Sequence, residues 1–242
     1  MIIEVNLTTI NNLLIKLESS KSMQERAIET DIVLIDIIDF SRLEMSKQLE
    51  LITFLSQSYR KMIRKLLENS DIPLEKMLQG IIPTGDGFYC ILHPKLKGFG
   101  PILGLSFNHF SDYIAKEYPY FKGIRVAVHT GKIHQFEDIL GQENFVGDGL
   151  NECARYVEMK NMVANTVFIS DTAFNSLETF LSDHEDFSDL LKKCEFRCSA
   201  LHTFHDKHEI LRNGYLIWMR QGGIISPPKQ DWLTPKRKNH AI

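Results

Sequence analysis

The chain has 242 residues, of which 43% are hydrophobic and 24% are charged, and its formal net charge is -3. These values are ordinary for a folded protein that buries one large core, and the weak negative charge argues against a general nucleic-acid-binding surface. No apolar run approaches the ~20 residues of a membrane helix, the first residues lack the pattern of a signal peptide, and the four cysteines lack disulfide-framework spacing. We therefore expect a cytoplasmic protein with no nucleic-acid or membrane partner.

Changes in apolar periodicity predict three parts of the chain: an N-terminal helix and connector over 1–30, one folded domain over 31–220, and a basic tail over 221–242. In chain order, the domain is expected to contain a strand ending near Asp36, a helix over Met45–Leu67, a hairpin around Asp86, a helix over Ile102–Tyr118, a strand over Gly123–Lys132 with a further arm to Leu140, a helix from Asn151, a strand over Thr166–Ser170 followed by a helix, and a last strand or hairpin over His208–Arg220. No element is predicted for Phe180–Cys194. This order favours an α/β (α+β) fold with a ferredoxin-like core, in which helices flank a central, mostly antiparallel sheet.

Two acids lie where strands of this sheet are expected to end. Asp36 belongs to the apolar run Asp31–Ser41, and Asp86 stands between two glycines in the run Ile81–Cys90, which has the pattern of a tight hairpin with an acid at its tip. Two carboxylates from adjacent strand ends can share a hard divalent cation that carries nucleotide phosphates. The simpler alternative is that Asp36 only caps a strand end, and we expect nearby Asp39 to be a solvated turn acid.

The domain contains four short motifs in order: Ile35-Asp36-Ile37-Ile38-Asp39-Phe40-Ser41, Thr84-Gly85-Asp86-Gly87, Val126-Ala127-Val128-His129-Thr130-Gly131, and Val146-Gly147-Asp148-Gly149-Leu150-Asn151-Glu152-Cys153-Ala154-Arg155. Together they resemble the catalytic domain of class III nucleotidyl cyclases, over roughly Asp31–Leu177. The resemblance implies that Asp36 and Asp86 bind two divalent metal ions, Mn²⁺ or Mg²⁺, and that Ile37 lends its backbone carbonyl. Such ions would activate the ribose 3′ hydroxyl for attack on the α-phosphate and assist the pyrophosphate leaving group.

Asn151 and Arg155 are four residues apart on a predicted helix and therefore share one face. The resemblance implies that Asn151 orients the ribose and that Arg155 stabilises the charge of the transition state. In the family these residues face the metal-binding acids across a dimer interface, so we expect a homodimer with two composite sites. The alternatives are that Asn151 only starts a helix and that Arg155 is an ordinary surface arginine.

The positions that read the base depart from the usual pattern of the family. The resemblance places Ile82 where adenylate cyclases carry lysine, and Asn144 where they carry aspartate. Ile82 cannot hydrogen-bond to a purine edge, whereas Asn144 can both donate and accept and would match a pyrimidine edge. The chain therefore looks like the pyrimidine cyclases of the bacterial antiphage systems known as Pycsar, which make cyclic UMP or cyclic CMP. Most such enzymes are uridylate cyclases, which favours UTP, but the residues themselves do not decide between UTP and CTP.

Two alternative functions stay open. One is an adenylate or guanylate cyclase with a divergent base pocket, and the other is an inactive cyclase-like module that binds nucleotide or dimerises. The retention of both acids together with Asn151 and Arg155 favours the active enzyme, because a binding module has no need of all four.

Three further residues are expected at the substrate or near it. The resemblance puts Phe40 at the substrate site, Lys132 is a candidate for binding the β- or γ-phosphate, and Lys207 is a weaker candidate for the same role. The late histidines have metal-like spacing but lack an acidic or cysteine partner, so we expect an ordinary loop; they are His202, His205 and His208.

Overall fold

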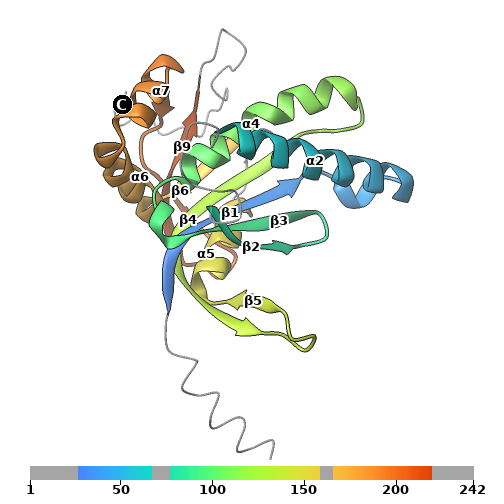
Figure 1. The fold of residues 1–242 in the computed structure, drawn as a ribbon, viewed down its shortest axis with the longest axis horizontal. Coiled ribbons are helices and arrows are strands. Elements are labelled where there is room, and N and C mark those ends of the chain that lie inside the picture. The colour runs from blue at the N-terminus through green and yellow to red at the C-terminus, as the bar shows by residue number, and fades with distance from the viewer. Residues whose placement is uncertain (1–26, 67–76, 159–165, 220–242) are drawn as a thin grey trace, which may run out of the picture.

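The computed structural model describes residues 27–66, 77–158 and 166–219, and Figure 1 shows their arrangement. The predicted helix near the start of the chain and the predicted basic tail lie outside the described residues. Among the described residues, no helix combines the length and the apolar character needed to cross a membrane.

The centre of the structure is one sheet that contains the predicted ferredoxin-like core. Its main strands are β1 (Ile28–Ile37), β2 (Leu78–Pro83), β3 (Gly87–Leu92), β4 (Ile124–Glu137), β6 (Thr166–Ser170), β7 (Arg197–Cys198) and β9 (Leu211–Trp218). They lie in the order β2-β3-β1-β4-β6-β9-β7, and of these neighbours only β4 and β6 are parallel. The order β2-β3-β1-β4 within a β-α-β-β-α-β sequence is the ferredoxin-like arrangement, so the predicted fold class is confirmed.

Helices cover both faces of this sheet. The larger apolar cluster forms where α2 (Met45–Leu66), α4 (Gly100–Glu117), α6 (Asp171–Asp183) and α7 (Glu185–Lys193) pack on one face, and the smaller cluster forms beneath α5 (Asp148–Val157) on the other. In Figure 1, α2 and α4 lie above the sheet, whereas α5 lies below it beside the arm formed by β4 and β5 (Glu143–Val146). The strand β8 (His202–His205) pairs with β9 at the other side of the sheet.

The strand β1 holds the two layers together because both of its faces are buried. Its odd-numbered residues, such as Val33 and Ile35, join the larger cluster, while its even-numbered residues, such as Ile32 and Leu34, join the smaller cluster beneath α5. This double burial explains the nearly continuous apolar run, since a strand covered on only one face would alternate apolar and polar residues. The alternation places the side chain of Asp36 on the α5 face, at the end of the strand.

Asp31 is a buried polar anchor at the other end of β1. Its carboxylate accepts hydrogen bonds from Thr130 Oγ1 at 2.6 Å, from the backbone nitrogen of Gly98 at 2.7 Å and from that of Gly100 at 2.8 Å. These bonds tie β1 to β4 and to the start of α4. Burial raises the pKa of Asp31 to about 6, although all three hydrogen bonds favour the ionised form.

The chain differs from the sequence-based expectations in three places. The strand β1 begins at Ile28, inside the stretch expected to be a connector. The stretch Phe180–Cys194, for which no element was predicted, contains the end of α6 and all of α7. Of the described strands, the expected last strand or hairpin over His208–Arg220 contains only β9; its hairpin partner β8 lies before this stretch, and the turn between them lies near Asp206.

Candidate active site

Asp36 and Asp86 lie next to each other at one edge of the β1–β3 ladder. Asp36 is opposite Gly87 in the ladder, and the backbone nitrogen of Ile37 donates to the carbonyl of Asp86 at 2.8 Å. A side chain at position 87 would collide with the carbonyl of Ile35, so a glycine is required for β3 to approach β1 this closely. The pairing register therefore brings the two predicted metal-binding acids together.

The electrostatics of this pair suit a divalent cation. Asp36 is only 9% exposed, and burial raises the pKa of its carboxyl; the guanidinium of Arg125 opposes this shift, and the neighbouring carboxylate of Asp86 adds to it. A carboxylate whose ionisation is opposed by burial and by a neighbouring carboxylate is stabilised by a hard cation that binds between the two. The described residues contain no cluster of three or more His, Cys, Asp or Glu side chains that could hold a metal. Two carboxylates nevertheless fit Mg²⁺ or Mn²⁺, because such ions commonly take their remaining ligands from water and substrate phosphates. The side chain of Ile37 is buried in the opposite cluster, so only its backbone could contribute at this edge.

Arg125 is a residue of this site that the sequence analysis missed. It lies opposite Asp36 in the β1–β4 ladder, its Nε donates to Asp36 Oδ2 at 2.7 Å, and a second guanidinium nitrogen pairs with the same oxygen. The signal in the sequence was a single cation in the apolar strand Ile124–Val128, but only the register with β1 shows which residue it faces. A guanidinium beside the carboxylate of Asp36 is placed to bind the oxygens of a phosphate chain.

Asp39 does not join the acid pair. Its backbone is left-handed, with φ of 57°, and its carboxylate pairs with Lys122 at 2.6 Å and with Arg42 at 3.5 Å. It is thus a turn acid held by surface cations, in agreement with the expectation.

The helix α5 carries Asn151 and Arg155 on the same face of the sheet as Asp36, but the structure does not bring them to the acids. The buried Cys153 anchors the helix, with its Sγ 3.4 Å from the carbonyl oxygen of Ile32. Asn151 is exposed, and the guanidinium of Arg155 pairs with Glu158 at 3.1 Å. Within the described ranges, no hydrogen bond or ion pair joins either residue to Asp36 or Asp86.

A partly buried ion network ties α5 to β9. Arg212 on β9 pairs with Glu152, the neighbour of Asn151, and its Nη2 pairs with Asp206 at 3.0 Å. Asp206 also accepts hydrogen bonds from the backbone nitrogens of His208 and Ile210. The network therefore joins the β8–β9 turn to the helix that carries the predicted catalytic residues.

The predicted base-reading residues lie on strands that touch each other. Ile82 is on β2 and packs against the smaller cluster, and Asn144 is on β5, with its Oδ1 accepting a hydrogen bond from the backbone nitrogen of Phe145 at 2.8 Å. The ring of Phe145 lies directly against Gly80, where a larger residue on β2 would collide with it. Ile82 and Asn144 thus lie on two strands that contact each other. Because the Oδ1 of Asn144 binds the backbone nitrogen of Phe145, the side-chain amide nitrogen of Asn144 is the donor that stays available.

Three predicted substrate contacts lie elsewhere. Phe40 is 7% exposed and packs in the larger cluster, on the face opposite Asp36, so it contributes to the core and leaves little surface for a substrate. Lys132 is opposite Glu29, seven residues along β4 from Arg125 and about 23 Å away at the usual rise of a strand, so it does not reach the acid pair of its own protomer. Lys207 pairs with Glu158 at 3.0 Å, beside Arg155.

Two of the late histidines bound a strand and do not lie in the expected loop. His202 is buried, His205 is exposed at the end of β8, and His208 lies in the following turn. They gather no metal-binding cluster within the described part of the chain.

This architecture, with two acids at the edge of a ferredoxin-like sheet and a helix on the same face, is the fold of class III adenylyl and guanylyl cyclase domains. The structure is similar to the adenylyl cyclase CyaB from P. aeruginosa, with a TM-score of 0.59 and 12% sequence identity over 84% of this chain and 97% of that one. It is also similar to the guanylate cyclase domain of RhGC from Catenaria anguillulae, in complex with GTP, with a TM-score of 0.53 and 17% identity over 81% of this chain and 100% of that one. No family model and no curated protein matches the sequence.

Proposed function

We propose that the protein is a nucleotidyl cyclase that converts UTP, or CTP, to the 3′,5′-cyclic nucleotide and pyrophosphate. The observation that carries the proposal is the adjacency of Asp36 and Asp86, held by the β1–β3 register, with Arg125 beside them. A residue that only caps a strand would not need a second carboxylate beside it in a partly buried site, where the carboxylate of Asp86 adds to the cost of ionising Asp36. An inactive module could keep the fold, but it would gain nothing from this costly arrangement.

Each residue has a distinct role in this reaction. Asp36 and Asp86 hold divalent ions, which, when bound, acidify the ribose 3′ hydroxyl and neutralise the triphosphate. Arg125 binds phosphate oxygens, a task for which Lys132 lies too far away within the protomer. Asn151 orients the ribose, and Arg155 donates to the α-phosphoryl oxygens as negative charge develops on them.

A composite site in a homodimer accounts for the separation of these two groups of residues. Asn151 and Arg155 do not contact the acids of their own chain, so a second copy would have to present them. The arm formed by β4 and β5 supports such an assembly, because it exposes four large apolar side chains: Phe136, Ile139, Leu140 and Val146. Exposed apolar residues gathered on a projecting arm commonly mark a protein–protein contact.

The base preference rests on Ile82 and Asn144. The strand β2 presents no hydrogen-bonding side chain at position 82, and a polar purine edge facing it would lose its hydrogen bonds to water without replacement. The smaller pyrimidine ring needs fewer polar partners, and the free amide donor of Asn144 can meet its carbonyl oxygen. By its resemblance to the Pycsar cyclases, we assign the product the role of a cytoplasmic second messenger in antiphage defence.

One assay separates the three possible functions. Purified protein is incubated with Mn²⁺ and each of the four ribonucleoside triphosphates, and the products are separated by chromatography. Cyclic UMP or cyclic CMP supports the proposal, cyclic AMP or cyclic GMP alone supports a purine cyclase, and the absence of any product with bound nucleotide supports the inactive module. Asp86→Ala should abolish product while the thermal transition is retained, because Asp86 is an exposed residue of a turn.

Subunit complementation tests the composite site. Asp86→Ala and Arg155→Ala should each be inactive alone, whereas an equimolar mixture should recover about a quarter of wild-type turnover, since about half of the dimers are mixed and each of these has one intact site. The matched control is a mixture of Asp86→Ala with Asp36→Ala, which stays inactive because both changes damage the same half of the site. Recovery in the control, or none in the first mixture, would contradict the composite site.

A further inference from the structure

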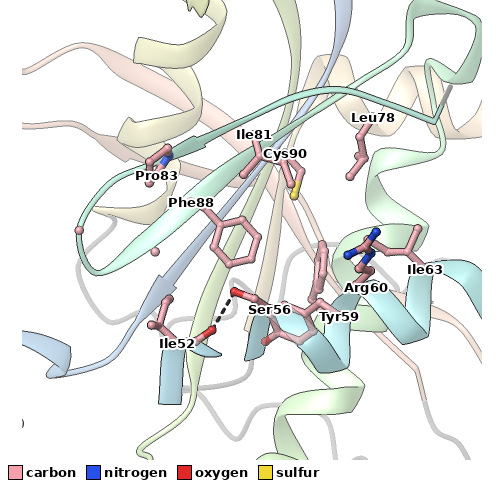
Figure 2. A pocket seen from close by; sticks show the side chains of 13 residues that line it. Ile52, Ser56, Tyr59, Arg60, Ile63, Leu78, Ile81, Pro83, Phe88 and Cys90 are labelled. Atoms are coloured by element: carbon pink, nitrogen blue, oxygen red, sulfur yellow. Dashed lines mark hydrogen bonds between the residues drawn. The ribbon is translucent and has the colours of Figure 1, made fainter. Parts of the chain in front are cut away.

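A cavity of about 490 Å³ lies between α2 and the β2–β3 hairpin, on the sheet face away from α5 (Figure 2). Its walls are mainly apolar and are built by Ile52, Tyr59, Ile63, Ile81, Phe88 and Phe107. The three rings form one aromatic surface, with the centroids of Tyr59 and Phe107 4.5 Å apart and those of Phe88 and Phe107 6.3 Å apart. The volume lies within the range of about 300–1,000 Å³ that is usual for small-molecule sites.

An exposed apolar side chain at the rim indicates that an occupant would be stabilised there. Ile81 is 57% exposed although it belongs to the wall of the cavity, and its strand β2 lies at the edge of the sheet formed by the described strands. Covering this side chain and the partly buried ring of Phe88 would remove apolar surface from water, which is the main source of affinity for small apolar ligands.

A positive charge at one end of the cavity indicates which polar group an apolar occupant would carry. Arg60 is exposed on α2 and lines one end of the cavity, beside Ile63 (Figure 2), and it forms no ion pair within the described ranges. The nearby hydroxyl of Ser56 already donates to the carbonyl of Ile52 at 2.7 Å, so it adds little to recognition. An apolar surface that ends at a guanidinium without an acidic partner among the described residues matches a small apolar molecule with a carboxylate at one end.

The cavity and the acid pair share the same hairpin. Gly85 and Gly87 line the cavity, and Asp86 lies between them with its carboxylate beside Asp36 on the other side of the sheet. Among the described strands, β2 pairs only with β3, so the hairpin has fewer restraints than the strands within the sheet. An occupant that packs against this wall therefore restrains the segment that carries Asp86.

We propose that this cavity binds a small apolar carboxylate and that its occupancy strengthens the binding of divalent cations at Asp36 and Asp86. The coupling rests on the proposed function, whereas the binding does not. A restrained hairpin loses less conformational entropy when the cation binds, so the two ligands bind with positive cooperativity.

The first experiment measures binding to the full chain without metal. Decanoate serves as the probe and decanol as its uncharged counterpart, each titrated by calorimetry. Decanoate should bind more tightly than decanol, and Arg60→Gln should weaken decanoate by roughly threefold to tenfold without affecting decanol. The matched control is Arg64→Gln, an exposed arginine one turn further along α2 that does not line the cavity.

A second variant tests the location. Ser56→Trp places a large ring at the mouth from an exposed position and should abolish decanoate binding, whereas Gln57→Trp, also exposed but outside the cavity lining, should not. The proposal is overturned if decanoate does not bind, if decanol binds equally well, or if Ser56→Trp binds decanoate like the wild type.

The second experiment measures coupling through free Mn²⁺, followed by electron paramagnetic resonance. Saturating decanoate should tighten Mn²⁺ binding about fivefold in the wild type, and Mn²⁺ should tighten decanoate by the same factor. Asp86→Ala should lose Mn²⁺ binding but keep decanoate binding. Mn²⁺ binding that depends on Asp86 but not on decanoate overturns the coupling alone. If no Mn²⁺ binding depends on Asp86, the proposed function and the coupling both fail, while the calorimetric result still decides whether the cavity is a ligand site.

Discussion

Removing the positive charge of Arg125 tests the electrostatic arrangement of the acid pair. In Arg125→Met, the apolar stem is largely kept, but the mostly buried carboxylate of Asp36 loses its ion pair and its hydrogen bond from Nε. Breaking one side of a buried charge pair costs about 3–5 kcal/mol, and the partial exposure of both side chains here reduces the expected loss to about 2–3 kcal/mol at pH 8.

The loss should depend on pH in a defined direction. Burial already raises the pKa of Asp36 above its unfolded value, and Arg125 opposes that shift, so removing Arg125 raises the pKa further. A group with a raised native pKa destabilises the fold as the pH rises from its unfolded pKa through its native pKa. The variant should therefore lose most stability at pH 8 and recover part of it towards pH 5, where Asp36 is more readily protonated.

Urea unfolding followed by circular dichroism at several pH values measures this effect. The matched control is Arg42→Met, because Arg42 pairs with Asp39 on the surface at 3.5 Å and its side chain is 78% exposed; this change should cost less than about 0.5 kcal/mol at every pH. Added Mn²⁺ should stabilise Arg125→Met more than the wild type, since the cation replaces the missing charge. A loss for Arg125→Met that is independent of pH, or no larger than the control, would refute the reasoning.

Three other changes test the anchor of β1, the arm and the helix α5. Between pH 4 and pH 7, the free energy of unfolding of the wild type should fall by up to about 3 kcal/mol relative to that of Asp31→Asn. The reason is that the native pKa of about 6 makes ionisation of Asp31 costly to the fold. Urea titrations in which the difference between the two proteins does not change with pH would contradict this. Ile139→Asp combined with Leu140→Asp should give monomers in analytical ultracentrifugation and no cyclase activity, with an unchanged thermal transition because both side chains are exposed. Arg212→Met should lower kcat more than it changes KM, because it shifts Glu152 and with it α5; a kcat equal to that of the wild type would contradict this role of the network.

Several elements were predictable because their signals are local. The long helices α2 and α4 repeat apolar residues every three or four positions, and the motifs around Asp36, Asp86 and Asn151 are continuous in the chain. The helix α7 was harder to recognise. It spans only Glu185–Lys193, and so short a segment shows too few helical repeats to stand out from a polar stretch with scattered aromatic residues.

The sequence by itself determined the order of the elements and the two acids at strand ends, because these depend on residues close together in the chain. Only the tertiary structure decided what those acids meet. The antiparallel registers of β1 with β3 and β4 place Asp86 and Arg125 against Asp36 and carry Lys132 to the far end of the same ladder. They also turn Phe40 into the core and set the hairpin of Asp86 over an apolar cavity. Such pairings join residues tens of positions apart. A shift of one residue in the pairing register would turn every side chain of a strand to the opposite face of the sheet, so no local pattern could reveal them.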